Sequence, residues 1–571
     1  MLKLVLALLA CLVSGKGTGC QKRLKKVCPG YNTDDTKAEC IACVKNNFAR
    51  LKKNCTMKIA LRKCNQPHPS PTPPTPVPPQ PPAPPCPPVA PTPNAPRPHI
   101  VLFVIDDQGW ANVGYHNPGN VITPNSDQLA KEGIRLERHY SFRWCAPSRS
   151  ALMTGRLPYH VLEKTNYVTR GMTFLPRKLQ SVGYTTHQLG KWHLGDTIDW
   201  MLPMNRGFNT SLGYLAGGED HYTQQQNGEA GCVGTDFWNT DQPAYGKNGT
   251  YAAYTYNNAA INIIKNHPDP SVNPLFMYVA TQTMHAPQEV PDYYSDQYST
   301  YFKDYAIMNG MATVSDEILG NITSALKDRN MWNNTLLIHV SDNGGPAGKL
   351  SSGHSGNNWP LRGGKTNNFE GGVRVASFLS GGFIPTNRRD IELHGYVHLA
   401  DWYPTLSILA GASPHDVPSK LGNITLPGVD GYNLWPYIKG AVENSPRTEI
   451  MLSSESNGAL ISGDMKIIYG LQTYAFWQSP IYPNASTDHS KETEFDCGTG
   501  CLFNITADPS EYVNLAGISG GQFARMNLLF QKRNATAFRA VRIKTDQLKC
   551  EAARDKRGGF LGPYLQQTEE L

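Results

Sequence analysis

Proline dominates one stretch of this chain and divides the sequence into two parts. Eighteen of the thirty-two residues from 67 to 98 are Pro. Because Pro lacks a backbone N–H and has a fixed φ, this stretch can form neither a helix nor a strand ladder. We expect it to run as an extended polyproline II spacer of roughly 100 Å. The sequence therefore predicts two independent units, with residues 66–98 as the linker between them.

The part before the linker combines a leader-like segment with a basic module. Residues 1–15 contain an apolar run, Leu4 to Val13, which is too short to cross a bilayer and is typical of a secretory signal peptide. Residues 16–65 hold thirteen Lys or Arg against three acidic residues. This charge could hold an anionic polysaccharide, and a solvated basic surface is the equal alternative. The signal makes nucleic acid the less favoured partner, and no other stretch looks transmembrane.

Cysteine usage indicates an oxidising compartment, and nine Asn-x-Ser/Thr sequons fit a secreted glycoprotein. Six Cys between residues 20 and 64 suggest three disulfides in one of fifteen pairings, with zinc at Cys40 and Cys43 as the alternative. Five Cys remain when these six, Cys11 in the leader and Cys145 are set aside. We expect one of the five, Cys86 in the linker, to be unpaired or to bridge two chains. The pairing of the other four stays open: Cys232, Cys497, Cys501 and Cys550.

Two continuous apolar runs after the linker end in oxygen-bearing side chains. Residues 100–105 precede Asp106 and Asp107, and residues 335–340 lead to Asp342 and Asn343. Such runs are typical of strands buried on both faces of a parallel sheet. Because ligand sites in open α/β sheets collect at the carboxyl ends of the strands, we expect these four side chains to meet. They would suit Ca²⁺, or Mg²⁺ as the smaller alternative, whereas Asp-Asp alone more often forms a helix cap or turn.

The segment from Cys145 to Arg149 has the chemistry of a helix start. Pro147 is tolerated in a first turn, and the following residues can continue the helix until Gly155. The amino terminus of this helix would direct its free N–H groups and its positive end at an anion beside Cys145. Arg149 would lie next to the same anion, with an ordinary surface arginine as the alternative.

Three further segments supply cationic or titratable side chains. Lys191 and His193 are two residues apart, so they share one face of an extended segment. His285 follows the apolar run 275–280, and Lys365 lies in a Gly-rich loop. Each alone would more often be structural or exposed, but their presence beside metal candidates favours a catalytic site.

Together these motifs resemble the type I, formylglycine-dependent sulfatases, and in particular the arylsulfatase B-like, or N-acetylgalactosamine-4-sulfatase-like, branch. The resemblance extends from about residue 97 to residue 515, with the motifs in matching order. The segments that carry it are Asp106-Asp107-Gln108-Gly109-Trp110, the Cys145 motif, Gly183-Tyr184-Thr185-Thr186, Gly190-Lys191-Trp192-His193-Leu194-Gly195, Arg206-Gly207-Phe208, Asp342-Asn343-Gly344-Gly345 and Asn358-Trp359-Pro360-Leu361-Arg362-Gly363.

The resemblance implies an alkaline-phosphatase-like α/β fold, in which a large mixed sheet lies between helices. A smaller carboxy-terminal α+β domain with an antiparallel sheet and a packing helix would follow. We therefore expect a catalytic domain at residues 99–440 and a carboxy-terminal subdomain and tail at residues 441–571. The basic module and the linker have no counterpart in the family pattern.

The resemblance also implies a nucleophile and a metal. The family oxidises its motif cysteine to formylglycine, so Cys145 would need a formylglycine-generating enzyme as a partner during maturation. The hydrated aldehyde carries two hydroxyls on one carbon; one attacks the sulfur, and loss of the proton of the other then expels sulfate. One Ca²⁺ ion would act as the Lewis acid. Its ligands would be Asp106, Asp107, Cys145, Asp342 and Asn343.

Five more side chains receive roles from the matching motifs. Arg149 would orient the hydrate, while Lys191 and Lys365 would grip the sulfate oxygens. His193 would remove the proton whose loss expels sulfate, and His285 would protonate the departing oxygen.

The substrate is the least constrained part of this interpretation. We expect a secreted sulfatase acting on sulfated polysaccharides or oligosaccharides, located in the extracellular matrix, the cell wall or an endolysosomal compartment. One alternative is a phosphohydrolase of the same superfamily, which normally uses Ser or Thr and commonly two metals. The other is a catalytically silent glycan-binding protein that keeps Cys145 unmodified. Residues 219–222 would form either the rim of the pocket or a bare loop.

Overall fold

The computed structural model describes residues 97–566, apart from 163–166, 229, 349–355, 417–419, 423, 455, 488–493 and 540–542. The expected signal peptide, the basic module and the linker up to residue 96 lie outside the described residues. The six cysteines of the module and Cys86 lie there as well.

A ten-stranded mixed sheet forms the centre of the fold. Its strands are ordered β13-β2-β12-β11-β1-β10-β4-β5-β8-β9. The central strand β1 pairs in parallel with β10 on one side and with β11 on the other. The strand bounds are β1 His99–Ile105, β2 Ile134–Leu136, β4 Thr185–Gly190, β5 Thr210–Gly213, β8 Trp238–Asn239, β9 Gln242–Pro243, β10 Leu275–Thr281, β11 Thr335–Ser341, β12 Ser377–Ser380 and β13 Ile391–Leu393.

The apolar runs read from the sequence are these buried strands. Alternate side chains of β1 enter two different cores because successive residues of a strand point to opposite faces. Ile100, Leu102 and Val104 join the core on one face, and Val101 and Phe103 join the core on the other. Burying each such side chain contributes roughly 1.5–3 kcal/mol to folding.

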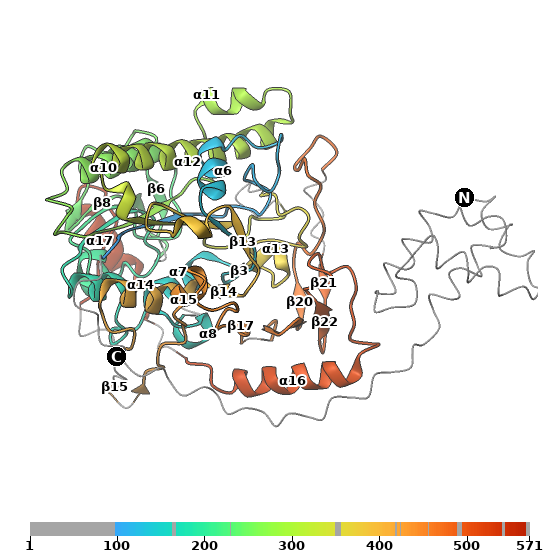
Figure 1. The fold of residues 1–571 in the computed structure, drawn as a ribbon. Coiled ribbons are helices and arrows are strands. Elements are labelled where there is room, and N and C mark those ends of the chain that lie inside the picture. Colours follow the sequence, from blue (N-terminus) through green and yellow to red (C-terminus); the bar gives the residue numbers. More distant parts are fainter. Residues whose placement is uncertain are drawn as a thin grey trace, which may run out of the picture. The chain divides into compact units, whose positions relative to one another are not determined.

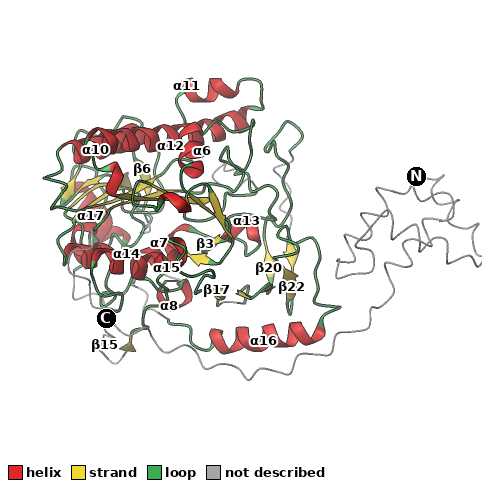
Figure 2. Cartoon of the chain, viewed as in Figure 1, coloured by secondary structure: helices red, strands yellow, loops and turns green. Residues whose placement is uncertain are grey.

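Helices cover both faces of the sheet (Figures 1 and 2). One layer contains α6 (Pro124–Lys131), α10 (Ala252–Lys265) and α12 (Lys303–Asp328), and the other contains α7 (Cys145–Thr154) and α14 (Trp402–Ala410). The other helices of the chain up to residue 440 are α8 (Pro158–Val161), α9 (Leu175–Gln180), α11 (Asp292–Ser295), α13 (Glu370–Val373) and α15 (Trp435–Ile438). This three-layer α/β architecture confirms the predicted fold class.

A second, antiparallel sheet follows in the carboxy-terminal part. Its strands are β17 (Glu449–Ser453), β18 (Ala459–Ser462), β19 (Met465–Ile468) and β22 (Cys501–Asn504). Helix α16 (Gly520–Asn534) packs on this sheet through Met526 and Phe530, which share a core with the strands. The predicted antiparallel sheet with a packing helix is therefore present, and the domain boundary near residue 440 stays a prediction.

Short two-stranded ladders complete the described secondary structure. They pair β3 (His139–Tyr140) with β14 (Val397–His398), β6 (Gln225–Asn227) with β7 (Val233–Thr235), β15 (Lys420–Leu421) with β16 (Ile424–Thr425), and β20 (Leu471–Gln472) with β21 (Phe495–Asp496). Six short 3-10 segments are η1 Asp199–Met201, η2 Pro203–Arg206, η3 Asp296–Tyr298, η4 Trp332–Asn334, η5 Thr386–Arg388 and η6 Leu399–Asp401.

Two disulfides pair the four cysteines whose partners the sequence left open. Cys497 pairs with Cys501, and Cys232 pairs with Cys550 in helix α17 (Gln547–Lys556). The second bond joins the tail to the region beside β7, across 318 residues of sequence. Close by, Trp238 Nε1 donates a hydrogen bond of 2.7 Å to the carbonyl of Leu561. The last described residues thus return to the edge of the large sheet.

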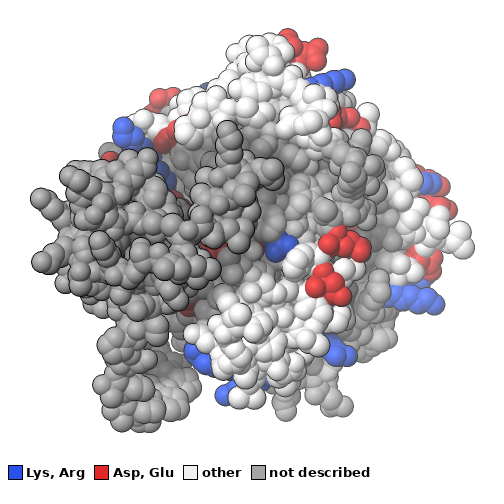
Figure 3. Space-filling model, turned by 90° about the vertical axis from the view of Figure 1, so that its right-hand side faces the viewer, with Lys and Arg blue, Asp and Glu red and all other residues white. Residues whose placement is uncertain are grey.

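The described surface carries charges of both signs. On the face that Figure 3 shows, acidic and basic side chains are interspersed instead of forming one field. Among the described helices, none combines the length and the apolar character that crossing a bilayer requires.

Candidate functional site

The ends of two neighbouring strands assemble the predicted metal ligands. Strands β1 and β11 pair in parallel with Ile105 opposite Ser341, so the residues after them emerge side by side. Ligand atoms of Asp106, Asp107, Asp342 and Cys145 lie within 4.8 Å of one another, and all four residues are buried. The register of one strand pair therefore explains how side chains more than two hundred positions apart in the sequence meet.

The chemistry of these residues fits a hard divalent cation. Three carboxylates converge, and Asn343 adds an amide whose Nδ2 donates to Asp107 Oδ1 at 2.7 Å. Its Oδ1 is buried and, within the described part of the chain, has no hydrogen-bond partner. A buried polar oxygen without a partner is costly, and coordination to a cation would satisfy it. The donor set is made of hard oxygens, which suit Ca²⁺ or Mg²⁺.

Cys145 lies at the first residue of helix α7, as the sequence predicted. Trp144 before it is extended, and Gly155 ends the helix with φ of 70°. The Cys145 Sγ is 3.5 Å from Asp106 Oδ1 and 3.9 Å from Asp107 Oδ1. Burial, together with the charge of Asp342, raises the pKa of the thiol well above its usual range. As a thiol, Cys145 is therefore protonated and a poor nucleophile, so covalent chemistry here calls for a different functional group.

Arg149, one helical turn after Cys145, points into the same cluster. Its Nε and Nη2 lie 2.9 and 2.8 Å from Asp342 Oδ2. Its Nη1 donates to the carbonyl of Lys191 and to the hydroxyl of Tyr278, at 3.2 and 3.1 Å. The side chain is fully buried, so the alternative of a surface arginine is wrong.

Two lysines from distant loops complete the charge balance. Lys191 Nζ is 2.7 Å from Asp106 Oδ2, and Lys365 Nζ is 2.7 Å from Asp107 Oδ2. Burial acts against the charged form of Lys365, but Asp107 overcomes it and the pKa of the ammonium lies above its usual range. With Arg149, these cations balance the three carboxylates. A bound divalent cation would leave the cluster with excess positive charge, and such a site attracts an anionic substrate.

The two predicted histidines face the cluster from separate strand ends. His193 follows β4, and burial with the nearby positive charge of Lys191 holds its pKa well below the usual value. It is therefore a neutral imidazole that can accept a proton. His285 follows β10, with Nε2 at 3.8 Å from Asp107 Oδ2. Its Nδ1 donates to the carbonyl of Ala286 at 2.8 Å, which orients the ring.

Four loops of this site contain a non-glycine residue with positive φ. Asp107 and His193 have φ of 65° and 56°, and the neighbours of His285 and Lys365, which are Met284 and Thr366, have φ of 77° and 83°. Residues with a side chain rarely adopt this region, and such strain is stored where function requires a special geometry. The conformations direct the side chains of several loops toward one point.

Several residues near the site were not predicted from the sequence. Tyr278 lies in the apolar strand β10, and its hydroxyl is the partner of Arg149. Asp236 accepts backbone hydrogen bonds in the loop behind His193. A buried tyrosine in an otherwise apolar run was a usable signal, because its hydroxyl must find a partner. No local pattern marked Asp236.

The loop at residues 219–222 lies against His285. The Nε2 atom of His221 is 3.1 Å from the carbonyl of His285. The backbone N–H of His221 donates to Glu289 Oε2 at 3.1 Å. Glu219 is buried and accepts a hydrogen bond from Tyr256 at 3.0 Å. The segment is therefore a structural part of the site and not a bare loop.

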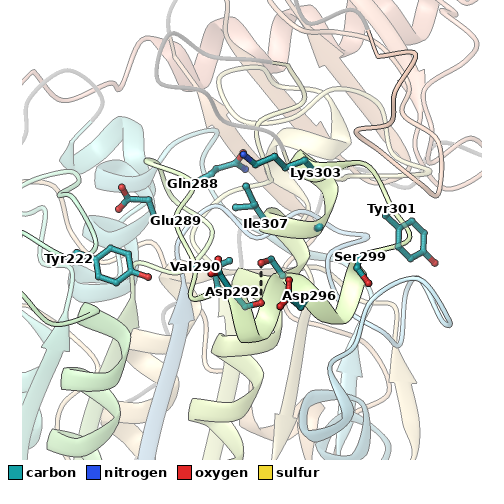
Figure 4. A pocket seen from close by; sticks show the side chains of 12 residues that line it. Tyr222, Gln288, Glu289, Val290, Asp292, Asp296, Ser299, Tyr301, Lys303 and Ile307 are labelled. Atoms are coloured by element: carbon teal, nitrogen blue, oxygen red, sulfur yellow. Dashed lines mark hydrogen bonds between the residues drawn. The ribbon is translucent and has the colours of Figure 1, made fainter.

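A surface hollow begins beside this loop (Figure 4). It has a volume of about 540 Å³ and is partly built from residues 288–290, which follow His285 closely. Tyr222 and Tyr301 lie toward its two ends in the view of Figure 4. Its polar and aromatic lining includes Tyr222, Gln288, Glu289, Asp292, Asp296 and Tyr301.

Comparisons with known proteins agree with this site. The sulfatase family model matches residues 98–412. Mouse arylsulfatase J is 32% identical over 518 residues, covering 84% of this chain and 82% of the mouse protein. Human arylsulfatase A is 27% identical, covering 74% of this chain and 83% of the human protein. The chain belongs to the sulfatase family, and it is an enzyme of the sulfuric ester hydrolase class.

Solved structures show the same fold. The crystal structure of Ps i-CgsB is 27% identical with a TM-score of 0.64, covering 77% of this chain and 94% of that chain. The same protein in complex with k-i-k-neocarrahexaose gives 26% identity and a TM-score of 0.63, covering 77% of this chain and 94% of that chain. The alkaline-phosphatase-like architecture expected from the sequence is thereby confirmed.

Proposed function

We propose that this chain hydrolyses sulfate esters of polysaccharides or oligosaccharides, with formylglycine at position 145 and one Ca²⁺ ion. The observation that carries the proposal is the convergence of Cys145 with three carboxylates and three cations in one buried cluster. A phosphohydrolase of the same superfamily would normally have Ser or Thr at position 145.

Asp106, Asp107, Asp342 and Asn343 would hold the cation together with the modified residue 145. The cation supplies Lewis acidity toward sulfuryl oxygens. Formylglycine supplies, as its hydrate, a nucleophilic hydroxyl and a second hydroxyl whose proton can be lost. Arg149, which already contacts Asp342, would fix the carboxylate on one side and keep the hydrate oriented on the other.

Lys191 and Lys365 would bind the sulfate oxygens of the substrate. Each now pairs with a carboxylate, and both lie near Cys145, whose pKa their charges act to lower. Helix α7 adds the free N–H groups of its first turn at the same place. Fixed positive groups in a buried site stabilise the charge that develops during sulfuryl transfer.

The two histidines would divide the proton transfers. His193, held neutral, would accept the proton from residue 145 when sulfate is released. His285, whose Nε2 faces Asp107, would give a proton to the departing oxygen. Their approach from two separate loops lets one act on the nucleophile side and the other on the leaving-group side.

Sulfated carbohydrate is the substrate class we favour. The related protein Ps i-CgsB forms a crystalline complex with the oligosaccharide k-i-k-neocarrahexaose. The hollow that begins at Tyr222 and Gln288 offers two tyrosine rings and several hydroxyl-binding groups to the rest of a sugar chain. The basic module at residues 16–65 would hold an anionic polysaccharide near the enzyme, since its charge is strongly positive.

An extracellular or endolysosomal location would suit this chemistry. Support comes from the signal-like residues 1–15, from the nine sequons and from the two described disulfides. Export through an oxidising compartment would also bring the chain to a formylglycine-generating enzyme.

Mass spectrometry of the peptide covering residues 143–156 would test the nucleophile. Protein secreted from cells that contain the generating enzyme should carry an aldehyde at position 145, and it should turn over 4-nitrophenyl sulfate in preference to 4-nitrophenyl phosphate. The C145A variant is the matched control and should be inactive. An intact thiol in a protein that binds sulfated polysaccharide without turnover would instead identify the silent glycan-binding alternative.

A further inference from the structure

The backbone of Gly217 and Gly218 lies against both histidines of the site. A Cβ atom on Gly217 would lie 2.9 Å from both Cε1 and Nε2 of His193. A Cβ atom on Gly218 would lie 2.8 Å from Cε1 of His285. Non-bonded carbon atoms are most stable at about 3.5–4.0 Å, so either side chain would displace a ring. The missing side chains leave room for the two imidazoles.

Backbone conformation does not account for these two glycines. Gly207 and Gly155 have φ of 109° and 70°, a region that favours glycine. Gly217 and Gly218 are not among the positive-φ glycines, so their φ values do not require glycine. Substitution by alanine at these two positions therefore tests the contact of the added Cβ with the imidazole rings, and not the release of a positive φ.

The segment that carries the glycines is anchored to both histidine loops. Just before them, the backbone N–H of His193 donates to the carbonyl of Leu215 at 2.9 Å. Just after them, His221 Nε2 lies 3.1 Å from the carbonyl of His285. Asp236, which is 1% exposed, accepts from the N–H groups of Leu215 and the next residue at 3.0 and 2.9 Å. These bonds hold the segment that carries the glycines next to both histidine loops.

We infer that Gly217 and Gly218 are positioning residues that set the two imidazoles independently. Gly217 fixes the place of His193, and Gly218 fixes the place of His285. The inference rests on the proton-transfer roles proposed above, because it assigns one glycine to the base and the other to the acid.

The two assignments have different kinetic consequences. A proton from His285 helps a basic leaving group most, whereas 4-nitrophenolate departs readily without one. His193 serves the release of sulfate, a stage that no longer contains the leaving group. Displacing His285 should therefore make the rate depend more steeply on leaving-group basicity, and displacing His193 should slow turnover of every substrate to a common value.

The test is steady-state kinetics on a series of aryl sulfates from 4-nitrophenyl to 4-methoxyphenyl sulfate. For G218A, kcat/KM should fall about tenfold or more for 4-methoxyphenyl sulfate relative to 4-nitrophenyl sulfate, because general acid catalysis is worth about 10²–10⁴-fold. For G217A, kcat should converge to one value across the series, with a lower KM. The control is G428A, since Gly428 has ordinary φ and no heavy atom within 4 Å of its added Cβ; both parameters should be unchanged. Equal losses across the series for G218A would overturn the inference.

Thermal unfolding provides a second readout that does not need activity. The G218A substitution should lower Tm in the wild-type background and have little effect in the H285A background, where the ring is gone. The pair G217A and H193A should behave in the same way. Equal Tm losses in both backgrounds would reject the contact, even for a variant that is too unstable to assay. A wild-type enzyme without sulfate turnover would reject the proposed function, while this thermal comparison would still be decisive for the contact.

Discussion

At the scale of single residues, paired charges hold the site together. Asp106, Asp107 and Asp342 are buried, and each lies within ion-pair distance of Lys191, Lys365 or Arg149. Without partners, such buried carboxylates would cost several kcal/mol each. The same cations compete with any metal for the carboxylate oxygens, so removing one of them should affect metal binding and catalysis in opposite directions.

The K365A variant tests this competition. It removes the 2.7 Å contact between Lys365 Nζ and Asp107 Oδ2, so Ca²⁺ affinity should stay equal or rise. The loss of one charge-assisted contact to sulfate, worth about 1.5–3 kcal/mol, should lower kcat/KM about 10- to 100-fold. Calorimetric Ca²⁺ titration of chelator-treated protein, alongside 4-nitrophenyl sulfate kinetics, would measure both effects. Weaker Ca²⁺ binding by K365A would contradict the proposed competition.

The D236N variant should reveal a pH-dependent stability. Burial raises the pKa of Asp236 to about 7, so the folded chain holds a proton that the unfolded chain loses above its normal value of 3.8. The contribution of this carboxyl is therefore fully present below the unfolded pKa and is lost as pH rises from there toward 7. The stability advantage of wild type over D236N, measured by chemical denaturation, should be largest near pH 4 and shrink toward pH 7. An advantage that grows with pH would disprove the raised pKa.

At the scale of elements, the sequence predicted what local patterns encode. The apolar runs at 100–105 and 335–340 were recognisable as buried strands, and the helix start at Cys145 followed from its Pro and its later Gly. The carboxyl ends of the strands located the acidic cluster. Contacts that depend on loop geometry are not encoded locally, so no sequence pattern predicted the packing of Gly217 on His193 or the pairing of Cys232 with Cys550.

The loop and helices around the hollow are expected to contribute to substrate binding and not to the chemical steps of the reaction. Tyr222 is 37% exposed and lines the hollow, whose lining residues include none of the acidic-cluster residues Asp106, Asp107, Asp342 and Cys145. The Y222A variant should raise KM for a sulfated oligosaccharide substrate about 2- to 10-fold, since a specific contact of an aromatic ring typically contributes about 0.5–1.5 kcal/mol. Its kinetics with 4-nitrophenyl sulfate should match wild type. Equal losses on both substrates would instead place Tyr222 in the structural support of His285.

At the scale of the whole molecule, buried ion pairs and a disulfide link distant parts of the chain. Lys466 of β19 lies 2.9 Å from Glu370 of α13 and 3.0 Å from Glu511. Burial, only partly offset by Lys466, raises the pKa of Glu511 to about 7. Because Glu370 belongs to α13 and Lys466 belongs to the second sheet, this triad couples that helix to the second sheet.

The C232S/C550S variant tests the contribution of the tail. The bond closes a loop of 318 residues, and removal of a native disulfide typically costs about 2–5 kcal/mol. We expect a lower Tm and faster proteolysis within residues 547–566, with wild-type KM for 4-nitrophenyl sulfate because residues 547–566 contribute no member of the acidic cluster. The matched control is C497S/C501S, whose loop spans 4 residues and should cost less. A larger loss of Tm in C497S/C501S than in C232S/C550S would show that the length of the loop closed by a disulfide does not explain the stabilisation.

The burial of Cys145 limits the stage of biosynthesis at which this residue could be modified. Every residue of helix α7 is buried, and the thiol points at the carboxylates instead of toward solvent. Under the proposed function a maturation enzyme must reach the Cys145 side chain, and the finished fold buries it. Oxidation would therefore have to precede folding, while the nascent segment is still accessible, and a molecule that folds too early would never acquire the proposed nucleophile.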